Sequence, residues 1–104
     1  MARQLAGGFL YTMKWYIYAL YNKETNKIYI GETSNVQRRV SEHNKKLGNH
    51  YTAKIKGDWK LIYKEEAEDR TNALIREKQL KSYRGRQFIK QFIPAWRNGS
   101  AASC

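Results

Sequence analysis

The sequence predicts a small α/β (α+β) domain of three strands and about three helices, and three observations lead to this expectation. Two short stretches rich in tyrosine and isoleucine, 16–21 and 27–30, flank a polar turn, and a third apolar stretch follows at 59–64. After the second and third stretches, apolar residues recur three and four positions apart, which is typical of helices. With 104 residues the chain is long enough for one domain with a modest core.

Residues 16–30 are predicted to form an antiparallel hairpin. Aromatic and β-branched side chains favour a strand that is at least half buried, and the turn at 22–26 contains two asparagines. Two strands around a five-residue polar turn are typical of a hairpin. Successive side chains point to opposite faces. This alternation predicts two groups: Tyr16, Tyr18 and Leu20 on one face, and Ile17, Ala19 and Tyr21 on the other.

Three segments are predicted to be helical. The first covers 34–46, with Ser34 or Asn35 as its N-cap. The second runs from about residue 70 to 83. A shorter third helix is expected at 85–93, because a proline follows it and cannot continue a helix.

The chain is strongly basic, with a net charge of +11 from 20 basic and 9 acidic residues. The charge is uneven: residues 34–56 carry a net +5, residues 57–75 a net −2, and residues 76–97 a net +6. A balance this basic usually indicates a polyanionic partner, most often nucleic acid. The acidic segment 65–69 is expected to be a turn at the start of the second helix, where the helix dipole favours negative charge.

The remaining features concern location and boundaries. The single cysteine, Cys104, has no partner for an internal disulfide, and no apolar run of about 18 residues is present, so a cytoplasmic location is expected. Residues 1–13 are interpreted as an N-terminal extension, with Met13 as a candidate alternative start. Residues 14–94 are expected to form the domain, and residues 95–104 a disordered tail.

Short motifs within this pattern point to one family. They are Tyr16-Ile17-Tyr18, then Tyr29-Ile30-Gly31, then Arg39 and His43 on one helical face, and Ala73-Leu74-Ile75-Arg76-Glu77 on the second helix. The chain thereby resembles the GIY-YIG nuclease family, in particular its small stand-alone single-domain (UPF0213-like) subgroup. A tyrosine replaces the glycine of the family's first signature. The resemblance implies a GIY-YIG-type fold, in which helices flank a small three-stranded antiparallel sheet.

Each motif residue also has a purely structural interpretation. A tyrosine taken alone is more often an ordinary strand aromatic, Arg39 a solvated helix charge, and His43 a histidine at the edge of the core. Glu77 falls on or beside the buried helix face, where a carboxylate is costly unless it is paired or binds metal. An ion pair with Lys81, four residues on, would satisfy it.

The resemblance implies a metal-dependent phosphodiester hydrolase. Glu77 would hold one Mg²⁺ or Mn²⁺, and Arg39 would clamp the scissile phosphate with its planar fork. Tyr18 or Tyr29 would orient and deprotonate water; the family suggests Tyr18, but the residues leave the order open. Because tyrosine titrates near about 10, a base role requires nearby cations. His43 would bind phosphate or relay a proton, and these five residues are the candidate catalytic set.

The predicted function is an endonuclease acting on DNA with little sequence specificity, with repair or recombination as candidate roles. Specificity would come from a protein partner, since residues 85–104 are too short for a fused recognition domain. The alternatives are a non-catalytic nucleic-acid-binding module and a basic accessory protein. Glu32, directly after Gly31, could bind metal or repel phosphate. The candidate phosphate contacts are Arg38, Lys45, Lys46, Lys54, Lys56, Lys81 and Arg84.

Overall fold

The computed structural model describes residues 14–46 and 51–94, so the predicted extension at 1–13 and tail at 95–104 lie outside the described residues. Three strands form one antiparallel sheet in the order β2-β1-β3, which makes β1 the central strand. The strands are β1 (Trp15–Asn22), β2 (Lys27–Thr33) and β3 (Trp59–Ala67). The predicted α/β (α+β) fold with its hairpin is therefore confirmed.

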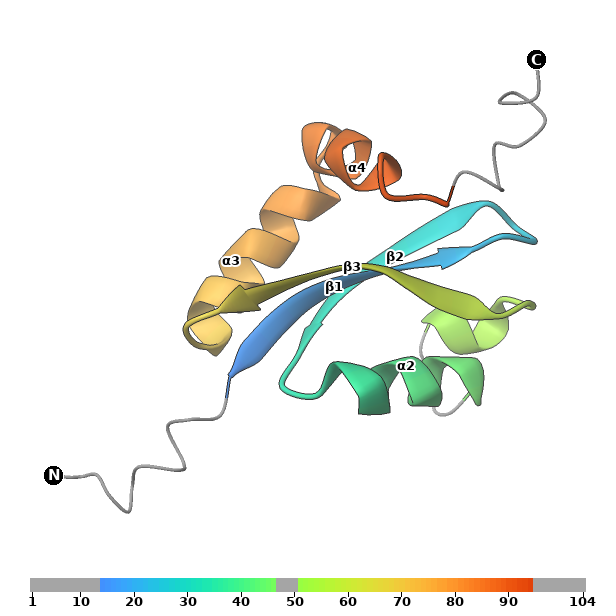
Figure 1. Ribbon diagram of the computed structural model, residues 1–104, viewed down its shortest axis with the longest axis horizontal. Helices are drawn as coiled ribbons and strands as arrows, with labels where there is room; N and C mark the ends of the chain where they lie inside the picture. The colour runs from blue at the N-terminus through green and yellow to red at the C-terminus, as the bar shows by residue number, and fades with distance from the viewer. Residues whose placement is uncertain (1–13, 47–50, 95–104) are drawn as a thin grey trace, which may run out of the picture.

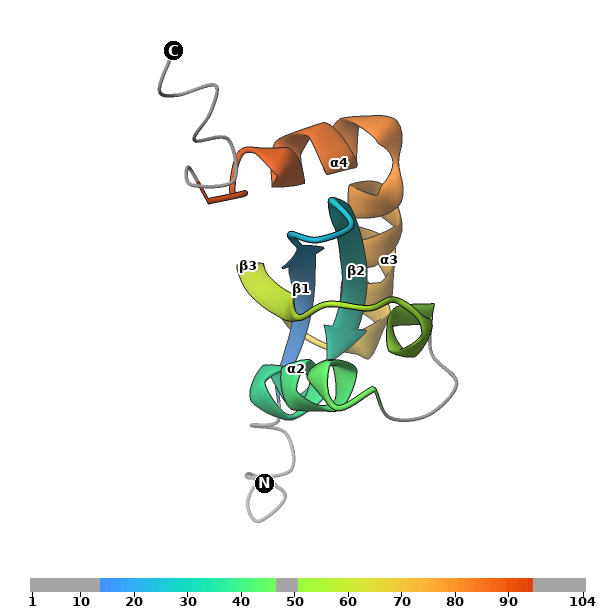
Figure 2. The same ribbon diagram turned by 90° about the vertical axis from the view of Figure 1, so that its right-hand side faces the viewer.

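Helices cover both faces of this sheet. They are α2 (Val36–Asn44), α3 (Arg70–Lys81), α4 (Tyr83–Lys90) and a short 3₁₀ helix, η1 (Tyr51–Lys54). Helices α3 and α4 lie on one face, and α2 lies on the other beside η1 (Figure 1, Figure 2). The two faces are called the α3 side and the α2 side below.

Each of the three α-helices begins at a polar N-cap residue. Asn35, Asp69 and Ser82 accept a hydrogen bond from the backbone N–H three residues later, at 3.0, 2.8 and 3.1 Å. Such caps satisfy donors that have no partner within the helix. Asn35 is thus the cap of the two candidates. The third helix starts at residue 83 instead of the predicted 85, because Ser82 ends α3 and begins α4.

Two apolar clusters form the core, one on each face of β1. The alternation predicted for β1 is confirmed, since Ile17 and Ala19 face α3 whereas Tyr18 and Leu20 face α2. Because both faces are covered, Ile17 through Asn22 are all buried. The α3-side cluster consists of Ile17, Ala19, Ile30, Ala73, Leu80 and Ile89; the α2-side cluster consists of Tyr18, Leu20, Val36 and Trp59.

Strand β3 continues past residue 64, where the sequence predicted an acidic turn. Glu65 and Glu66 belong to the strand instead. Glu65 pairs with Arg76 of α3 at 3.0 Å, and Glu66 pairs with Lys14 at 2.7 Å. An edge strand tolerates such charges because its side chains reach solvent or cationic neighbours. The prediction of a turn at 65–69 was therefore wrong for residues 65–67, which belong to β3.

Candidate active site

The candidate site begins at Tyr18, in the middle of the central strand. Its side chain is fully buried on the α2 side, and its hydroxyl lies 2.9 Å from Nε2 of His43 on α2. The histidine is itself only 2% exposed. A strand and a helix thus hold the two groups together in the interior.

Gly31 makes room for the Tyr18 ring. The two residues face each other across the β1–β2 pair. A Cβ atom at position 31 would lie 2.8 Å from the Tyr18 hydroxyl oxygen and 2.9 Å from its Cζ atom, closer than carbon atoms pack. The glycine that ends the second signature is therefore required for space, and it sets the position of the tyrosine.

Thr52 completes a chain of three polar side chains. Its hydroxyl oxygen lies 2.5 Å from Nδ1 of His43, and Thr52 is fully buried. Two hydrogen-bonding patterns satisfy this chain. In one, Nδ1–H donates to Thr52 and Nε2 accepts from the Tyr18 hydroxyl; in the other, both directions are reversed. Either way, both ring nitrogens of His43 are occupied.

The loop that carries Thr52 is anchored by side chains from elsewhere. The indole N–H of Trp59 donates to the Thr52 carbonyl oxygen at 3.4 Å. The ammonium group of Lys46 donates to the carbonyl oxygens of Ile55 and Gly57, at 2.8 and 2.6 Å. Two of the three N–H groups of Lys46, one of the predicted phosphate contacts, thereby fix this segment.

Arg39 lies one turn before His43 on α2 and acts electrostatically on Tyr18. Its side chain is about one-fifth exposed, and its guanidinium donates to Glu42 at 2.7 Å. Burial is the main effect that raises the pKa of Tyr18 above its usual range; the neighbouring Tyr29 adds to it, and the charge of Arg39 opposes it. The cation required by the sequence argument is thus present, yet burial prevails and favours a neutral Tyr18.

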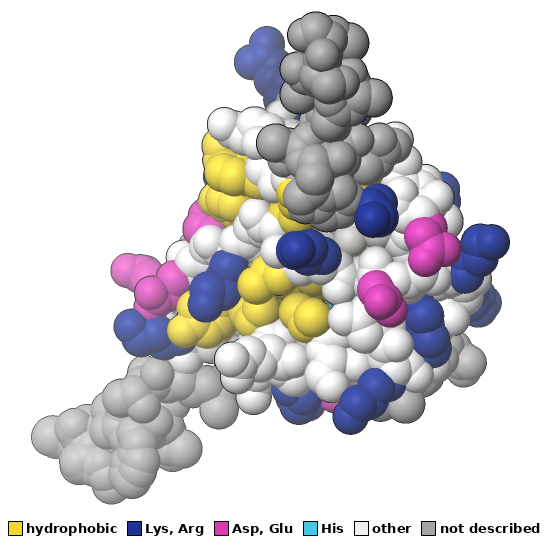
Figure 3. Space-filling view, turned by 45° about the vertical axis from the view of Figure 1, so that its right-hand side comes forward, with side chains coloured by type: hydrophobic (Ala, Val, Ile, Leu, Met, Phe, Trp, Pro, Cys, Tyr) yellow, Lys and Arg dark blue, Asp and Glu magenta, His cyan; other side chains and the backbone are white. Residues whose placement is uncertain are grey.

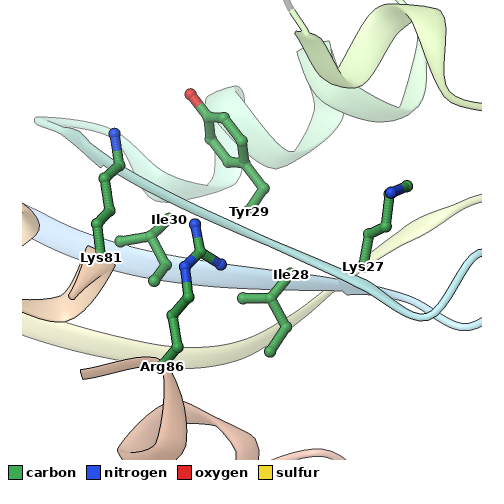
Figure 4. A pocket seen from close by; sticks show the side chains of 6 residues that line it. All are labelled: Lys27, Ile28, Tyr29, Ile30, Lys81 and Arg86. Carbon is green, nitrogen blue, oxygen red and sulfur yellow. The ribbon is translucent and has the colours of Figure 1, made fainter. Parts of the chain in front are cut away.

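Tyr29 has a different environment from Tyr18. Its ring lies 4.8 Å from the His43 ring and 6.2 Å from the Tyr18 ring, between centroids. It is only partly buried, and it lines an open pocket on strand β2 (Figure 4). Of the two tyrosines, Tyr29 is therefore the one that solvent can reach.

Glu77 lies on α3, which packs on the other face of the sheet. Its side chain is 16% exposed and pairs with Lys81 at 2.9 Å, the structural alternative expected from the sequence. Lys81 also lines the pocket that contains Tyr29. The Glu77 carboxylate therefore forms an ion pair with a residue that lines the pocket.

Comparison with known proteins identifies the family. The model of the GIY-YIG catalytic domain matches residues 14–90. The chain belongs to the GIY-YIG family. It is 43% identical over 75 residues to a UPF0213 protein of Limosilactobacillus reuteri, covering 71% of this chain and 77% of that protein. It is 34% identical over 77 residues to a UPF0213 protein of Staphylococcus haemolyticus, covering 74% and 92%.

A solved structure is also similar to this GIY-YIG chain. It is the solution NMR structure of the UPF0213 protein BH0048 from Bacillus halodurans, which is 27% identical. The match covers 76% of this chain and 84% of that chain, with a TM-score of 0.45. The expected membership of a nuclease-type family, in its small stand-alone subgroup, is confirmed by the domain match and the UPF0213 relatives.

Within this GIY-YIG domain, Tyr18, Tyr29, Arg39 and His43 converge on the α2 side. Glu77 stands apart from them on α3, and among residues 14–46 and 51–94 no three His, Cys, Asp or Glu side chains could jointly hold a metal ion. A single carboxylate completed by water and substrate phosphate is nevertheless a usual arrangement for Mg²⁺. The chemistry of Glu77 therefore fits one such ion but not an all-protein cage.

Glu32 lies on the α3 side, because its cross-strand partner is Ile17. One carboxylate oxygen is buried and has no hydrogen-bond partner within the described residues, although Arg70 approaches it to 3.7 Å. The sheet thus separates Glu32 from the Tyr18 hydroxyl and His43.

The other predicted phosphate contacts lie at the surface. Figure 3 shows basic side chains spread over one face of the molecule, with acidic ones and hydrophobic patches between them. Arg38 is exposed and approaches Glu42 at 3.7 Å. The remaining exposed residues of this group are Lys45, Lys54, Lys56, Lys81 and Arg84.

Sequence reasoning missed Thr52 and the steric role of Gly31. No motif marks Thr52, since it lies in a connecting segment and meets His43 only through the fold.

No described helix is long and apolar enough to span a bilayer.

Proposed function

We propose that this protein is a metal-dependent endonuclease that hydrolyses phosphodiester bonds in DNA with little intrinsic sequence specificity. The observation that carries the proposal is that Tyr18 of β1 meets His43 and Arg39 of α2, beside the partly exposed Tyr29 of β2. Membership of the GIY-YIG family supplies the reaction type. Together they provide a proton-accepting chain and a cation at one place.

The two tyrosines take different parts in the proposed reaction. Tyr29, which lines the open pocket, orients the attacking water. Tyr18 stays neutral, because burial raises its pKa, and therefore acts as a proton carrier rather than as a resting phenolate. It passes its proton to Nε2 of His43 as it accepts one from the water side. This requires the pattern in which His43 carries its proton on Nδ1 and donates it to Thr52.

Arg39 stabilises the charge that develops on the phosphate. A guanidinium group suits this role because it can donate two parallel hydrogen bonds to phosphate oxygens and stays charged. Its ion pair with Glu42 holds the side chain within the site. The pKa of Arg39 is set by burial, Glu42 and Tyr18. Burial disfavours the charge, but the two partners prevail and raise the pKa of Arg39.

Glu77 is the residue that would hold the single Mg²⁺ or Mn²⁺. When bound, such an ion would neutralise phosphate charge and support the leaving oxygen. Release of Glu77 from Lys81 would free the carboxylate for this purpose. Lys81 would then be available to a phosphate group.

The surface lysines and arginines would contact the phosphate backbone and contribute no sequence information. Binding should therefore weaken steeply with salt. A protein partner would supply substrate specificity, as in a repair or recombination complex.

The test is cleavage of labelled single-stranded, duplex and branched DNA, and of RNA, with Mg²⁺, Mn²⁺ or EDTA. Cutting that needs metal and disappears in both Glu77→Ala and Tyr18→Phe supports the endonuclease. Cutting that persists in EDTA or in Glu77→Ala overturns it.

A second candidate is a nucleic-acid-binding module without catalysis. The observation that favours it is the ion pair between Glu77 and Lys81, which satisfies the carboxylate without any metal. Tight, salt-dependent binding of the same substrates without cleavage would support the module.

A further inference from the structure

A pocket of about 480 Å³ lies along strand β2, at one edge of the sheet (Figure 4). Strand β2 supplies most of its wall, α3 and α4 contribute one basic side chain each, and none of its lining residues is acidic. The lining residues are Lys27, Ile28, Tyr29, Ile30, Lys81 and Arg86.

The charge of this pocket favours an anion. Within residues 14–46 and 51–94, neither Lys27 nor Arg86 has a carboxylate partner within 4.0 Å, whereas Lys81 pairs with Glu77. Arg86 is partly buried, which reduces the screening of its charge by water. These two cations, one on a strand and one on a helix, make the pocket suited to a phosphate group, because both side chains are phosphate donors.

The remaining lining is apolar and aromatic. Ile30 is 1% exposed, and Ile28 is partly buried against the α3-side cluster. Tyr29 borders the pocket from β2, but its ring points to the α2 side, away from Ile28 and Ile30 (Figure 4). A surface that combines cations with an apolar wall suits the phosphate and sugar of a nucleotide, and the Tyr29 ring lies just across the edge of the sheet.

We propose that this pocket binds the phosphate and sugar of one nucleotide next to the scissile phosphate, on the same nucleic-acid strand. Tyr29 links the two places, because it lines the pocket and its ring lies 4.8 Å from that of His43. The strand would cross β2 from Arg39 toward Arg86. This inference rests on the proposed function and adds Lys27 and Arg86 to the residues that hold substrate.

The test measures binding of a fluorescein-labelled single-stranded DNA in EDTA, which prevents cleavage. One phosphate at a time is replaced by an uncharged methylphosphonate, and the affinities are compared for the wild type and for Lys27→Gln/Arg86→Gln. The matched control is Lys78→Gln/Lys90→Gln, which removes two exposed positive charges from α3 and α4 outside the pocket. Thermal unfolding establishes that all three proteins are folded.

The pocket variant should bind about tenfold more weakly, and its salt dependence should fall by about one phosphate contact. Neutralising one particular phosphate should weaken DNA binding by the wild type and by the control. It should not weaken binding by the pocket variant any further, because that variant already lacks the contact with this phosphate. A scan with the same profile in all three proteins overturns the inference and leaves the endonuclease standing. A wild type that binds none of the DNA overturns both.

Discussion

The Tyr18 hydroxyl lies 2.9 Å from Nε2 of His43, although the two residues are 25 positions apart. The contact joins the centre of the sheet to α2 and is shielded from solvent at both ends. A neutral tyrosine bonded to a histidine can transfer a proton without ionising at rest. The proposed chemistry depends on this pair more than on either residue alone.

The first prediction concerns Thr52, the third member of this chain. Thr52→Val keeps the shape of the side chain but removes the hydroxyl that hydrogen-bonds Nδ1 of the buried His43. We expect a loss of about 1–3 kcal/mol in the free energy of unfolding, together with a lower kcat. Urea denaturation measures the first effect and single-turnover cleavage the second.

Thr52→Ser is the matched control, because it restores the hydroxyl and should recover most of both losses. The ¹⁵N chemical shifts of His43 report which ring nitrogen carries the proton, a property that a merely structural role would not change. Unaltered His43 shifts in Thr52→Val would show that Thr52 does not position the histidine.

The sequence predicted the fold more completely than the site. The hairpin, the two faces of β1 and three helices follow from local patterns of apolar residues and caps, and the structure contains them. The motifs also placed Arg39 and His43 on one face of α2. By contrast, the burial that keeps Tyr18 neutral and the contact with Thr52 arise from tertiary packing, which no local pattern encodes. The extra length of β3 depends on partners for Glu65 and Glu66 that lie elsewhere in the chain.

The second prediction is that Gly31→Ala displaces Tyr18. The new methyl group would lie 2.8 Å from the hydroxyl oxygen, so the ring or the strand must shift. We expect a destabilisation of about 1–3 kcal/mol and loss of the bond to His43. In a Tyr18→Leu background the same substitution should cost much less, since the Tyr18 ring is absent and only the contact with Tyr29 Cε2, at 3.0 Å, remains close. An equal cost in both backgrounds, measured by urea denaturation, would contradict the steric explanation.

The third prediction concerns alkaline pH. Because folding raises the pKa of Tyr18, the folded state retains this proton above about pH 10, where the unfolded chain loses it. The contribution to stability is complete below that pH and declines above it, by up to about 1.4 kcal/mol per pH unit.

Tyr18→Phe lacks this component, so the difference in unfolding free energy between the two proteins should change between about pH 9 and about pH 11. Tyr63, whose pKa burial and Glu65 also raise, is present in both proteins and cancels in the comparison. A difference that stays constant over this range would show that Tyr18 titrates normally.

The fourth prediction contrasts two neighbouring arginines on α2. Arg39 is about one-fifth exposed and acts on Tyr18, whereas Arg38 is 57% exposed and lies 3.7 Å from Glu42. Arg39→Ala should lower kcat on the order of a hundredfold. Arg38→Ala should instead raise KM and reduce the salt dependence of binding by about one contact. Similar effects of both substitutions on kcat would contradict a special role for Arg39.

The last prediction separates the ion pair of Glu77 from its proposed metal role. Glu77→Gln removes the pair with Lys81, which is worth about 0.3–0.5 kcal/mol at such helix spacing, so stability should change little. If the carboxylate holds the ion, cleavage should nevertheless fall by at least about a hundredfold, and raising the Mg²⁺ concentration should restore part of it. Glu66→Gln is the control, because it breaks the comparable ion pair with Lys14 outside the site and should leave cleavage intact. Equal cleavage by the two variants would mean that Glu77 serves only to pair Lys81 and holds no catalytic ion.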